Sequence, residues 1–336
     1  MNSLIIISIL SLSAVLISVI FFSFYIKIME GKSLVKQSKL IPNKKKILGE
    51  GGLPFFATFF FFLLILILLK YYDINLNNKN DFHLLFFLFC ILIFVFISYL
   101  DDKYDLSKFL RFVIQLTCVF LSLSFLNTRV LEYLPLKLEL IILIFFWVYI
   151  INVTNFIDGL NGFLALNCIS FFFGTLIILN NYNLHSHFIF IISLISINIL
   201  FVFLYFNFIK TKIFLGDTGS IPLGFIIGYV TLYLLELKIF IPLLFLFIYP
   251  ILDVTLTILN KVFLRKQYPW ERLFDYFFLK PVIKGKQTHE FVFYRVFILN
   301  IVNMLLLVIY LKTSNLFTIP VLIVANFYCL KFFSKF

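Results

Sequence analysis

Apolar segments long enough to cross a lipid bilayer recur along the whole chain. An α-helix needs about 17–25 residues to span the hydrocarbon core, and by this criterion about 10–11 transmembrane helices are expected. Of the 336 residues, 62% are hydrophobic and only 13% are charged, which is more apolar surface than a soluble domain can bury. The predicted fold is therefore all-α, a single polytopic membrane domain over residues 1–336. The expected spans are approximately 4–26, 53–69, 82–100, 109–127, 138–154, 162–179, 188–209, 221–235, 239–259, 291–311 and 316–330.

Lysine and arginine are distributed unevenly between the two sets of connecting loops. One set holds 22 of these 28 residues. By the positive-inside rule the richer set faces the cytoplasm, so the N-terminus is expected outside and the C-terminus inside. The net charge of +12 is thus a topology signal. No nucleic-acid-binding motif accompanies it, and no nucleic-acid partner is expected. The predicted cytoplasmic loops are 27–52, 101–108, 155–161, 210–220 and 260–290.

Acidic residues recur at the predicted cytoplasmic ends of these spans. Carboxylates beside a bilayer are unfavourable unless water, cations or a metal ion receive them, so a positive group is expected among them. A solvated helix cap would explain any one of these carboxylates, but it would not explain why all of them fall on the same side of the membrane. An ion pathway would place them nearer the middle of the membrane. We therefore predict phosphoryl transfer at the cytoplasmic face, with a magnesium-held, phosphate-rich substrate. The residues are Asp101, Asp102, Asp105, Asp158, Asp217 and Asp253.

Amides and glycines accompany two of these carboxylates. Asn152, Asn155 and Asp158 are three residues apart, so a continuing helix would bring them near one face. The segment Gly216-Asp217-Thr218-Gly219-Ser220 is expected to open a helix, and the N–H groups at a helix N-terminus favour an anion. Asp217 is therefore predicted to bind a metal ion that carries phosphates with it.

The first cytoplasmic loop contains Lys44, Lys45 and Lys46, followed by Gly51 and Gly52. Lysines followed by glycines can hold phosphates through charge and through accessible backbone N–H groups. The alternative is an ordinary polybasic segment that touches anionic lipid headgroups. Both interpretations stay open.

Taken in order, these motifs resemble the polyprenyl-phosphate N-acetylhexosamine-1-phosphate transferase superfamily (glycosyltransferase family 4). The resemblance extends over nearly the whole chain. It rests on Pro42-Asn43 with Gly51-Gly52, Asp101-Asp102-x-x-Asp105-Leu-Ser with Arg111 and Gln115, Asn152-x-x-Asn155-x-x-Asp158-Gly159, and Lys212-Ile-Phe-Leu-Gly216-Asp217-x-Gly219-Ser220.

The resemblance implies an enzyme of the bacterial plasma membrane that transfers an N-acetylhexosamine 1-phosphate from a UDP-sugar to undecaprenyl phosphate. UMP leaves, and the product initiates a cell-envelope polysaccharide such as the O-antigen of lipopolysaccharide. Both a direct attack and a covalent enzyme intermediate are compatible with the sequence. The active site would lie on the cytoplasmic face, and a homodimer is compatible with the lipid-facing composition.

The resemblance also implies roles for individual residues. Asp217 would bind Mg²⁺, with Mn²⁺ as an alternative ion, and Asp101 or Asp102 would act as the base for the lipid phosphate or orient it. Phe214 would stack on uracil. The implied nucleotide-binding residues are Asn155, Asp158, Asn207 and Phe214, and the implied phosphate-binding residues are Lys103, Lys108, Arg111 and Lys212. Further candidate substrate contacts are Asn152, Asp105, Gly51, Gly52 and His289.

The last cytoplasmic loop departs from the family pattern. Members usually show several histidines there, whereas this loop has only His289. This favours the undecaprenyl-phosphate GlcNAc-1-phosphate transferase, or O-antigen-initiating, type over phospho-MurNAc-pentapeptide transferase, which stays an alternative. A transporter or flippase of lipid-linked sugars is the rival from another class. It predicts paired half-helices broken near mid-membrane, and the sequence shows none.

Overall fold

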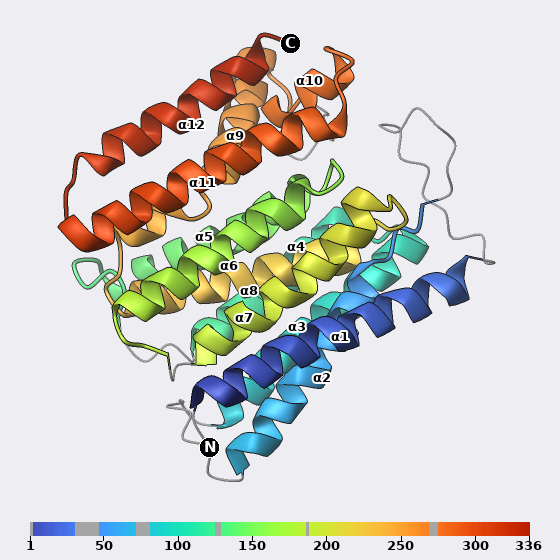
Figure 1. Cartoon of the computed structure of the whole chain (residues 1–336). Helices are drawn as coiled ribbons and strands as arrows, with labels where there is room; N and C mark the ends of the chain where they lie inside the picture. Colours follow the sequence, from blue (N-terminus) through green and yellow to red (C-terminus); the bar gives the residue numbers. More distant parts are fainter. Residues whose placement is uncertain (1–2, 31–46, 72–80, 125–128, 186–187, 269–274) are drawn as a thin grey trace.

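The computed structural model describes residues 3–30, 47–71, 81–124, 129–185, 188–268 and 275–336. Within them the fold is all-α (Figure 1). An isolated parallel bridge between Leu48 and Ile213 is the nearest approach to a β-strand in the described part. The α-helices are α1 (Ser3–Met29), α2 (Gly52–Tyr71), α3 (Asp81–Tyr104), α4 (Lys108–Leu123), α5 (Leu136–Phe156), α6 (Phe163–Asn181), α7 (Phe188–Leu204), α8 (Asp217–Glu236), α9 (Ile248–Leu259), α10 (Lys280–Ile283), α11 (His289–Thr313) and α12 (Thr318–Ser334).

Short helical turns extend or separate some of these helices. Two are π-helical and continue α7 and α9 directly; the other two are 3-10 turns. They are η1 (Tyr205–Ile209), η2 (Pro242–Phe245), η3 (Asn260–Leu264) and η4 (Phe277–Leu279).

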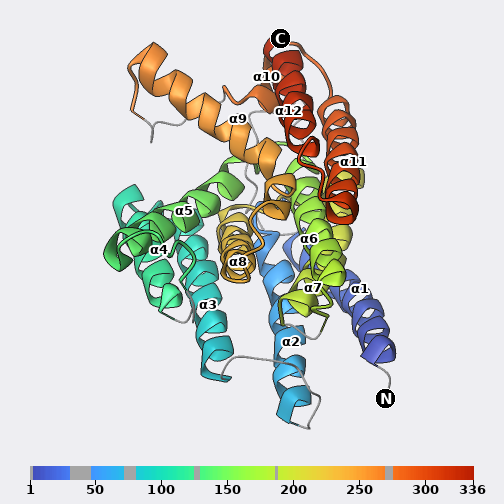
Figure 2. The ribbon, with the colours of Figure 1, turned by 90° about the vertical axis from the view of Figure 1, so that its left-hand side faces the viewer.

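Seven helices of the described chain are long and apolar enough to cross a membrane: α1, α3, α5, α6, α7 with η1, α8 and α11. Helices α2 and α12 are also apolar, but their described apolar segments are shorter. The protein is therefore a multi-pass membrane protein, as the apolar runs predict. In both ribbon views the N-terminus and the C-terminus lie at opposite ends of the bundle (Figures 1 and 2).

The predicted span 239–259 is not one helix. It begins with the 3-10 turn η2 and continues as α9 only from Ile248. Pro242 stands at the start of η2, a position at which its missing N–H breaks no hydrogen bond of the turn. The helix that follows leans away from the rest of the bundle (Figure 2).

Helix α8 is the most buried of the seven candidate spans and packs against α3, α5 and α2. On α5, the indole N–H of Trp147 donates to the carbonyl oxygen of Phe225 at 3.0 Å, and the two rings stack 4.9 Å apart. An apolar, fully buried contact of this kind fixes the position of α8 along its axis. The first residue of α8 is Asp217, so this packing also places the candidate site.

Buried amides connect the C-terminal helices to each other and to the bundle. Asn326 on α12 donates to Asn303 on α11 at 3.0 Å, and Asn300 on α11 donates to Asn167 on α6 at 3.3 Å. Hydrogen bonds between polar side chains commonly hold transmembrane helices together, because in lipid apolar contact alone gives little preference for one helix partner over another.

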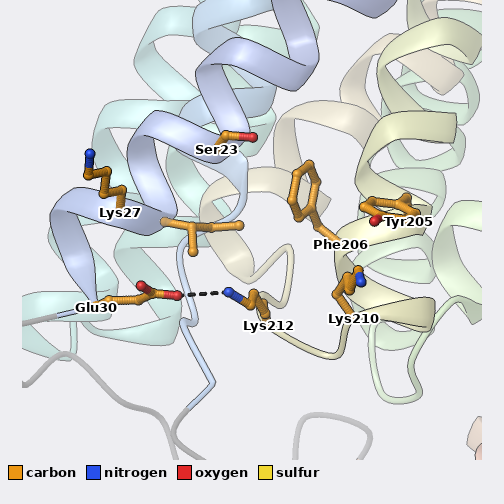
Figure 3. A pocket seen from close by; sticks show the side chains of 8 residues that line it. Ser23, Lys27, Glu30, Tyr205, Phe206, Lys210 and Lys212 are labelled. Atoms are coloured by element: carbon orange, nitrogen blue, oxygen red, sulfur yellow. Dashed lines mark hydrogen bonds and ion pairs between the residues drawn. The ribbon is translucent and has the colours of Figure 1, made fainter.

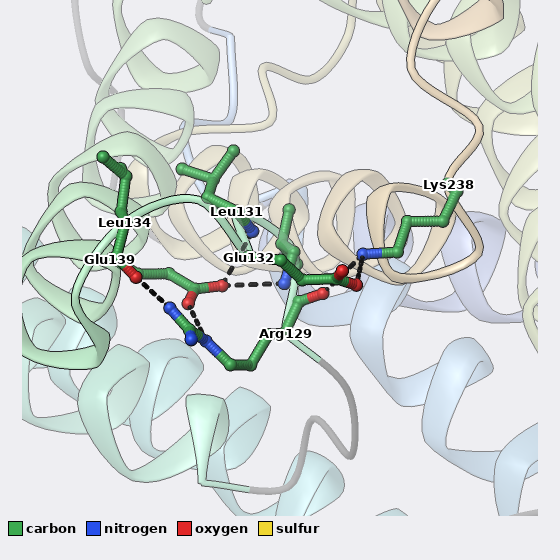
Figure 4. Close-up of polar contacts among 7 residues, drawn as sticks. Arg129, Leu131, Glu132, Leu134, Glu139 and Lys238 are labelled. Carbon is green, nitrogen blue, oxygen red and sulfur yellow. Dashed lines mark hydrogen bonds and ion pairs between the residues drawn. The ribbon is translucent and has the colours of Figure 1, made fainter.

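The end of the bundle opposite Asp217 carries an ionic cluster (Figure 4). The carboxylate of Glu139 is buried and accepts from Arg129 at 2.8 Å and from the backbone N–H groups of Val130 and Leu131. Lys238, just after α8, donates to the carbonyl oxygen of Arg129 and forms an ion pair with Glu132. This cluster pins the loop before α5 to the end of α8, about 30 Å from the other end of α5.

Candidate active site at the start of helix α8

The chain reverses direction between α3 and α4, and this reversal builds one wall of the site. Helix α3 continues through Asp101 and Asp102 to Tyr104, and Asp105 then takes a left-handed conformation with φ of 55°. The Ser107 hydroxyl caps α4 by accepting from the N–H of Leu110 at 3.2 Å. Asp105 thus forms the turn and is exposed, instead of extending the helical face of Asp101.

Arg111 supplies the positive group expected among the carboxylates. One of its Nη atoms lies 2.6 Å from a carboxylate oxygen of Asp101 and 3.5 Å from a carboxylate oxygen of Asp217. The hydroxyl of Thr218 donates to Asp102 at 2.9 Å. The ends of α3 and α4 therefore meet the N-terminus of α8, and Asp101, Asp102 and Asp217 lie in one cluster.

The cluster has donor atoms suited to a hard cation. Asp101 is 7% exposed, and its Oδ1 atom is buried without a hydrogen-bond partner, although its Oδ2 atom binds Arg111. Among the described residues no three His, Cys, Asp or Glu side chains are grouped as a complete metal site. Mg²⁺ usually takes one or two carboxylates and completes its shell with water and substrate phosphates, so this donor set fits it.

Close backbone contacts hold the loop that leads into α8. The carbonyl oxygens of Phe214 and Leu215 accept from the N–H groups of Gly51 and Gly52 at 2.8 and 2.9 Å. A Cβ atom on Gly52 would lie 2.3 Å from the backbone nitrogen of Gly219, so no larger residue fits there. Gly216 has φ of +71°, the left-handed region that glycine adopts without strain. Gly51 and Gly52 therefore brace the site loop in the described structure.

The turn after α5 joins the same loop. Asp158 accepts from the N–H of Gly216 at 3.0 Å, and the amide of Asn155 donates to Ser220 at 3.2 Å. Asn152 instead donates to Gln115 on α4 at 3.0 Å. Asn152 and Asn155 both belong to α5, which ends at Phe156, so Asp158 lies in the turn beyond the helix that was expected to continue.

Asn207 is buried and connects two loops by hydrogen bonds. It is 3% exposed; its side-chain oxygen accepts from the N–H of Gly162 at 2.6 Å, and its amide donates to the carbonyl of Ile213 at 2.7 Å. The same turn receives His289, whose Nδ1 atom accepts from the N–H of Asn161 at 3.3 Å. Asn207 and His289 thus link the end of α7 and the start of α11 to the turn that carries Asp158.

The predicted phosphate-binding lysines Lys103, Lys108 and Lys212 are all exposed. Lys103 and Lys108 are exposed on either side of the α3–α4 turn, and Lys103 lies over the ring of Tyr104. Lys212 points to α1, where it pairs with Glu30 at 2.9 Å. The half-buried Phe214 belongs to the braced loop before Asp217. The predicted residues Pro42, Asn43, Lys44, Lys45 and Lys46 lie outside the described residues.

The last loop is docked on the site by Asp253, which is fully buried. Its carboxylate accepts from the N–H groups of Phe277 and Phe278, each at 2.9 Å, and from the Tyr249 hydroxyl at 3.0 Å. The Phe278 ring stacks on Phe163 at 4.2 Å, directly after the turn that carries Asp158. Asp253 therefore connects α9 with the last loop and is not part of the Asp101–Asp217 cluster.

A second carboxylate tightens this loop. Asp275 is paired with Arg265 and lies 3.8 Å from the ammonium of Lys284. Burial alone would raise the pKa of Asp275, but the hydrogen bond from Arg265 and the positive charges of Arg265, Lys284 and Lys280 outweigh it and hold the pKa below its usual value.

The sequence did not predict two contacts: the hydrogen bond from Thr218 to Asp102, and the ion pair of Glu30 with Lys212. The Gly-Asp-Thr-Gly-Ser motif contains the hydroxyl of Thr218, and the O–H donor of that hydroxyl could have suggested a carboxylate partner. Glu30 gives no such signal, because its pairing with Lys212 depends on how α1 and α7 pack.

These features define a multi-pass, all-α membrane protein with an arginine-linked carboxylate cluster where three helices meet. Residues 84–235, which include the whole cluster, match glycosyl transferase family 4. This match covers just under half of the chain and agrees with the resemblance predicted from the motifs.

Named relatives also match parts of the chain. A probable undecaprenyl-phosphate N-acetylglucosaminyl 1-phosphate transferase of Bacillus subtilis is 34% identical over 194 residues, covering 52% of this chain and 51% of that protein. A phospho-N-acetylmuramoyl-pentapeptide-transferase of Leuconostoc citreum is 32% identical over 136 residues, covering 38% and 42%. One of the same name from Petrotoga mobilis is 32% identical over 163 residues, covering 42% and 49%. The chain thus spans about half, or less, of the length of each.

Proposed function

We propose that this protein transfers an N-acetylhexosamine 1-phosphate from a UDP-sugar to undecaprenyl phosphate and releases UMP. The observation that supports this most is the contact of Arg111 with both Asp101 and Asp217. It brings two carboxylates and a guanidinium to the N-terminus of α8, and such an N-terminus favours phosphate. We place the reaction at the cytoplasmic face of a bacterial plasma membrane, where it would initiate a cell-envelope polysaccharide.

The net chemistry exchanges one bond to phosphorus for another. A bond forms between an oxygen of the lipid phosphate and the sugar-linked phosphorus, and the bond from that phosphorus to UMP breaks, so UMP leaves with the electron pair. Negative charge spreads over the phosphate oxygens during such a transfer, and catalysis is mostly positioning and electrostatic stabilisation. Arg111 is the cation already fixed beside the carboxylates, and it would stabilise this charge.

The carboxylates would have distinct tasks. Asp217 and the partnerless Oδ1 atom of Asp101 would hold Mg²⁺, or Mn²⁺ in its place, and the ion would neutralise the donor diphosphate. The hydrogen bond from Thr218 orients Asp102, which would receive or orient the lipid phosphate. Asp158 and Asn155 hold the loop from Gly216 to Ser220 in place, and the nucleotide would bind beside them.

The identity of the sugar would depend on the last loop. Asp253 and the stacked rings of Phe163 and Phe278 dock this loop against the turn of Asp158. Its described part contains His289, and the sequence shows no further histidine in residues 260–290. We therefore favour a UDP-N-acetylhexosamine as the donor over the larger peptide-bearing donor implied by the name of the phospho-N-acetylmuramoyl-pentapeptide-transferases.

The test is an assay of the purified chain with undecaprenyl phosphate, Mg²⁺ and a panel of UDP-N-acetyl sugars, including UDP-MurNAc-pentapeptide. UMP release together with a polyprenyl diphosphate sugar is expected with one UDP-N-acetylhexosamine. Turnover with the pentapeptide donor alone would reassign the enzyme within the family. Absence of UMP with every donor, where a working family member releases it, would favour transport of lipid-linked sugars.

A further inference from the structure

A pocket of about 310 Å³ lies between the C-terminal end of α1 and the turn η1 that continues α7 (Figure 3). Phe22 on α1 stacks on Phe206 of η1 at 5.9 Å beside the pocket, and Asn198 on α7 donates to Ser11 on α1 at 2.8 Å further from it. Ser23 and Ile26 on α1 line one side of the pocket, and Tyr205 and Phe206 of the π-helical turn η1 line the other. π-helical turns widen a helix locally and are frequent at functional sites.

The lining of the pocket is basic. It holds Lys27, Lys210 and Lys212 against one acidic residue, Glu30. Glu30 and Lys212 face each other at 2.9 Å at one edge, and Lys210 lies beside them, over the ring of Tyr205 (Figure 3). Both members of the pair are about half exposed, so the pair itself contributes little to stability. An anion that enters the pocket would displace Glu30 and pair with Lys212 in its place.

The surroundings indicate that this anion arrives on a lipid. The pocket lies at the ends of two candidate membrane spans, Ile9–Met29 and Phe188–Ile209, the level at which headgroups lie. Next to it, the apolar side chains of Phe24, Ile28 and Ile209 are exposed at 64%, 44% and 66%. These side chains would face acyl chains, whereas a free phosphate would gain nothing from them. Basic pockets between transmembrane helices on this side of a membrane bind anionic headgroups.

We propose that the pocket between α1 and η1 binds the phosphate of an anionic phospholipid. The site is separate from the Asp101–Asp217 cluster and does not depend on the proposed transfer reaction. Lys210 and Lys27 supply charge, the walls formed by Ile26 and Phe206 exclude water from one side, and Glu30 sets the affinity by competing for Lys212.

The experiment is native mass spectrometry of the full chain in detergent, titrated with phosphatidylglycerol or with phosphatidylcholine of the same acyl chains. Retention of phosphatidylglycerol over phosphatidylcholine is expected. A lysine that contacts the bound headgroup should change affinity for an anionic lipid by about fivefold, so a Lys27→Gln, Lys210→Gln double variant should retain phosphatidylglycerol roughly thirtyfold less well. The Glu30→Gln variant should retain it about fivefold better.

A Lys331→Gln, Lys335→Gln variant is the matched control, because these exposed lysines lie at the end of α12 and line no part of the pocket. It should bind as the wild type does. Equal loss in this control, or no loss in the pocket variant, would overturn the proposal. So would equal retention of both lipids, or displacement of phosphatidylglycerol by millimolar inorganic phosphate, which would show a site for a free anion. Lipid retention is measured without turnover, so failure of the proposed transfer reaction would leave this result unchanged.

Discussion

Arg111 and Asp217 are 106 residues apart in the chain, yet a guanidinium nitrogen of Arg111 lies 3.5 Å from a carboxylate oxygen of Asp217. The same nitrogen lies 2.6 Å from Asp101. A single cation thus links the ends of α3, α4 and α8. With phosphate groups bound, Arg111 would be shared between protein carboxylates and substrate.

The Asp217→Asn variant should insert normally and lose activity. The amide keeps the shape of the side chain but removes the charge that would hold the metal ion and its phosphates. Loss of one preorganised electrostatic group typically lowers kcat by roughly 10²–10³. The measurement is UMP release per mole of folded, membrane-inserted protein.

The control for this variant is Glu132→Gln at the other end of the bundle, where Glu132 forms an exposed ion pair with Lys238. Such pairs contribute about 0–1 kcal/mol, so activity should be unchanged. Near-normal turnover in Asp217→Asn would remove Asp217 from the metal site.

The Arg111→Gln variant should be less stable than the wild type by about 2 kcal/mol, because Asp101 would stay buried without its cation. The value lies below that of a fully buried pair since the Arg111 side chain keeps 21% exposure. Adding Asp101→Asn should restore part of the loss. Thermal unfolding in detergent measures both, and additive effects in the double variant would show that the pair is not coupled.

The helices follow from the sequence because an apolar run of membrane length has few other ways to satisfy its backbone. Each of the eleven predicted runs contains helix in the described structure. The break near Pro242 was less predictable. Proline is tolerated in membrane helices when neighbours satisfy the freed backbone groups, and the neighbours are not visible in a linear sequence.

The site was predictable only in part, because some of its side-chain directions depend on contacts between segments that are distant in the sequence. Asp101, Asp102 and Asp217 stand at helix ends, and helix ends on one side of a bundle are brought together by topology alone. The directions of Asn207 and Lys212 depend instead on how the loop before α8 pairs with residues 48–52. That pairing turns Asn207 inward and Lys212 toward Glu30, and no periodicity in the loop predicts it.

The Asp275→Asn variant should loosen the last loop at neutral pH. In the wild type the pKa of Asp275 is lowered in the fold, so its contribution is fully present above the unfolded-state pKa near 4 and is lost as the pH falls below that value. Hydrogen exchange in residues 275–283, corrected for the intrinsic rate, should therefore rise between about pH 5 and pH 3.

In the variant this exchange should be raised already at pH 7 and should vary less with acid. Exchange that stays the same between about pH 5 and pH 3 in the wild type would contradict the lowered pKa of Asp275. Asp253→Ala should open the same residues further, because it leaves the N–H groups of Phe277 and Phe278 without their acceptor.

Substitution of His289 should lower activity, whereas substitution of His185 should leave it unchanged. His289 accepts from the N–H of Asn161 and joins the last loop to the turn of Asp158, whereas His185 lies at the other end of α6, against Phe190. Replacing His289 with alanine removes an acceptor from a half-buried N–H, so kcat/KM for the UDP-sugar should fall by about tenfold. His289→Asn, which keeps an acceptor near Nδ1, should recover part of it, and His185→Ala should match the wild type. A large loss in His185→Ala would instead place the active site at the end of the bundle where His185 lies, away from the cluster of Asp217 and Arg111.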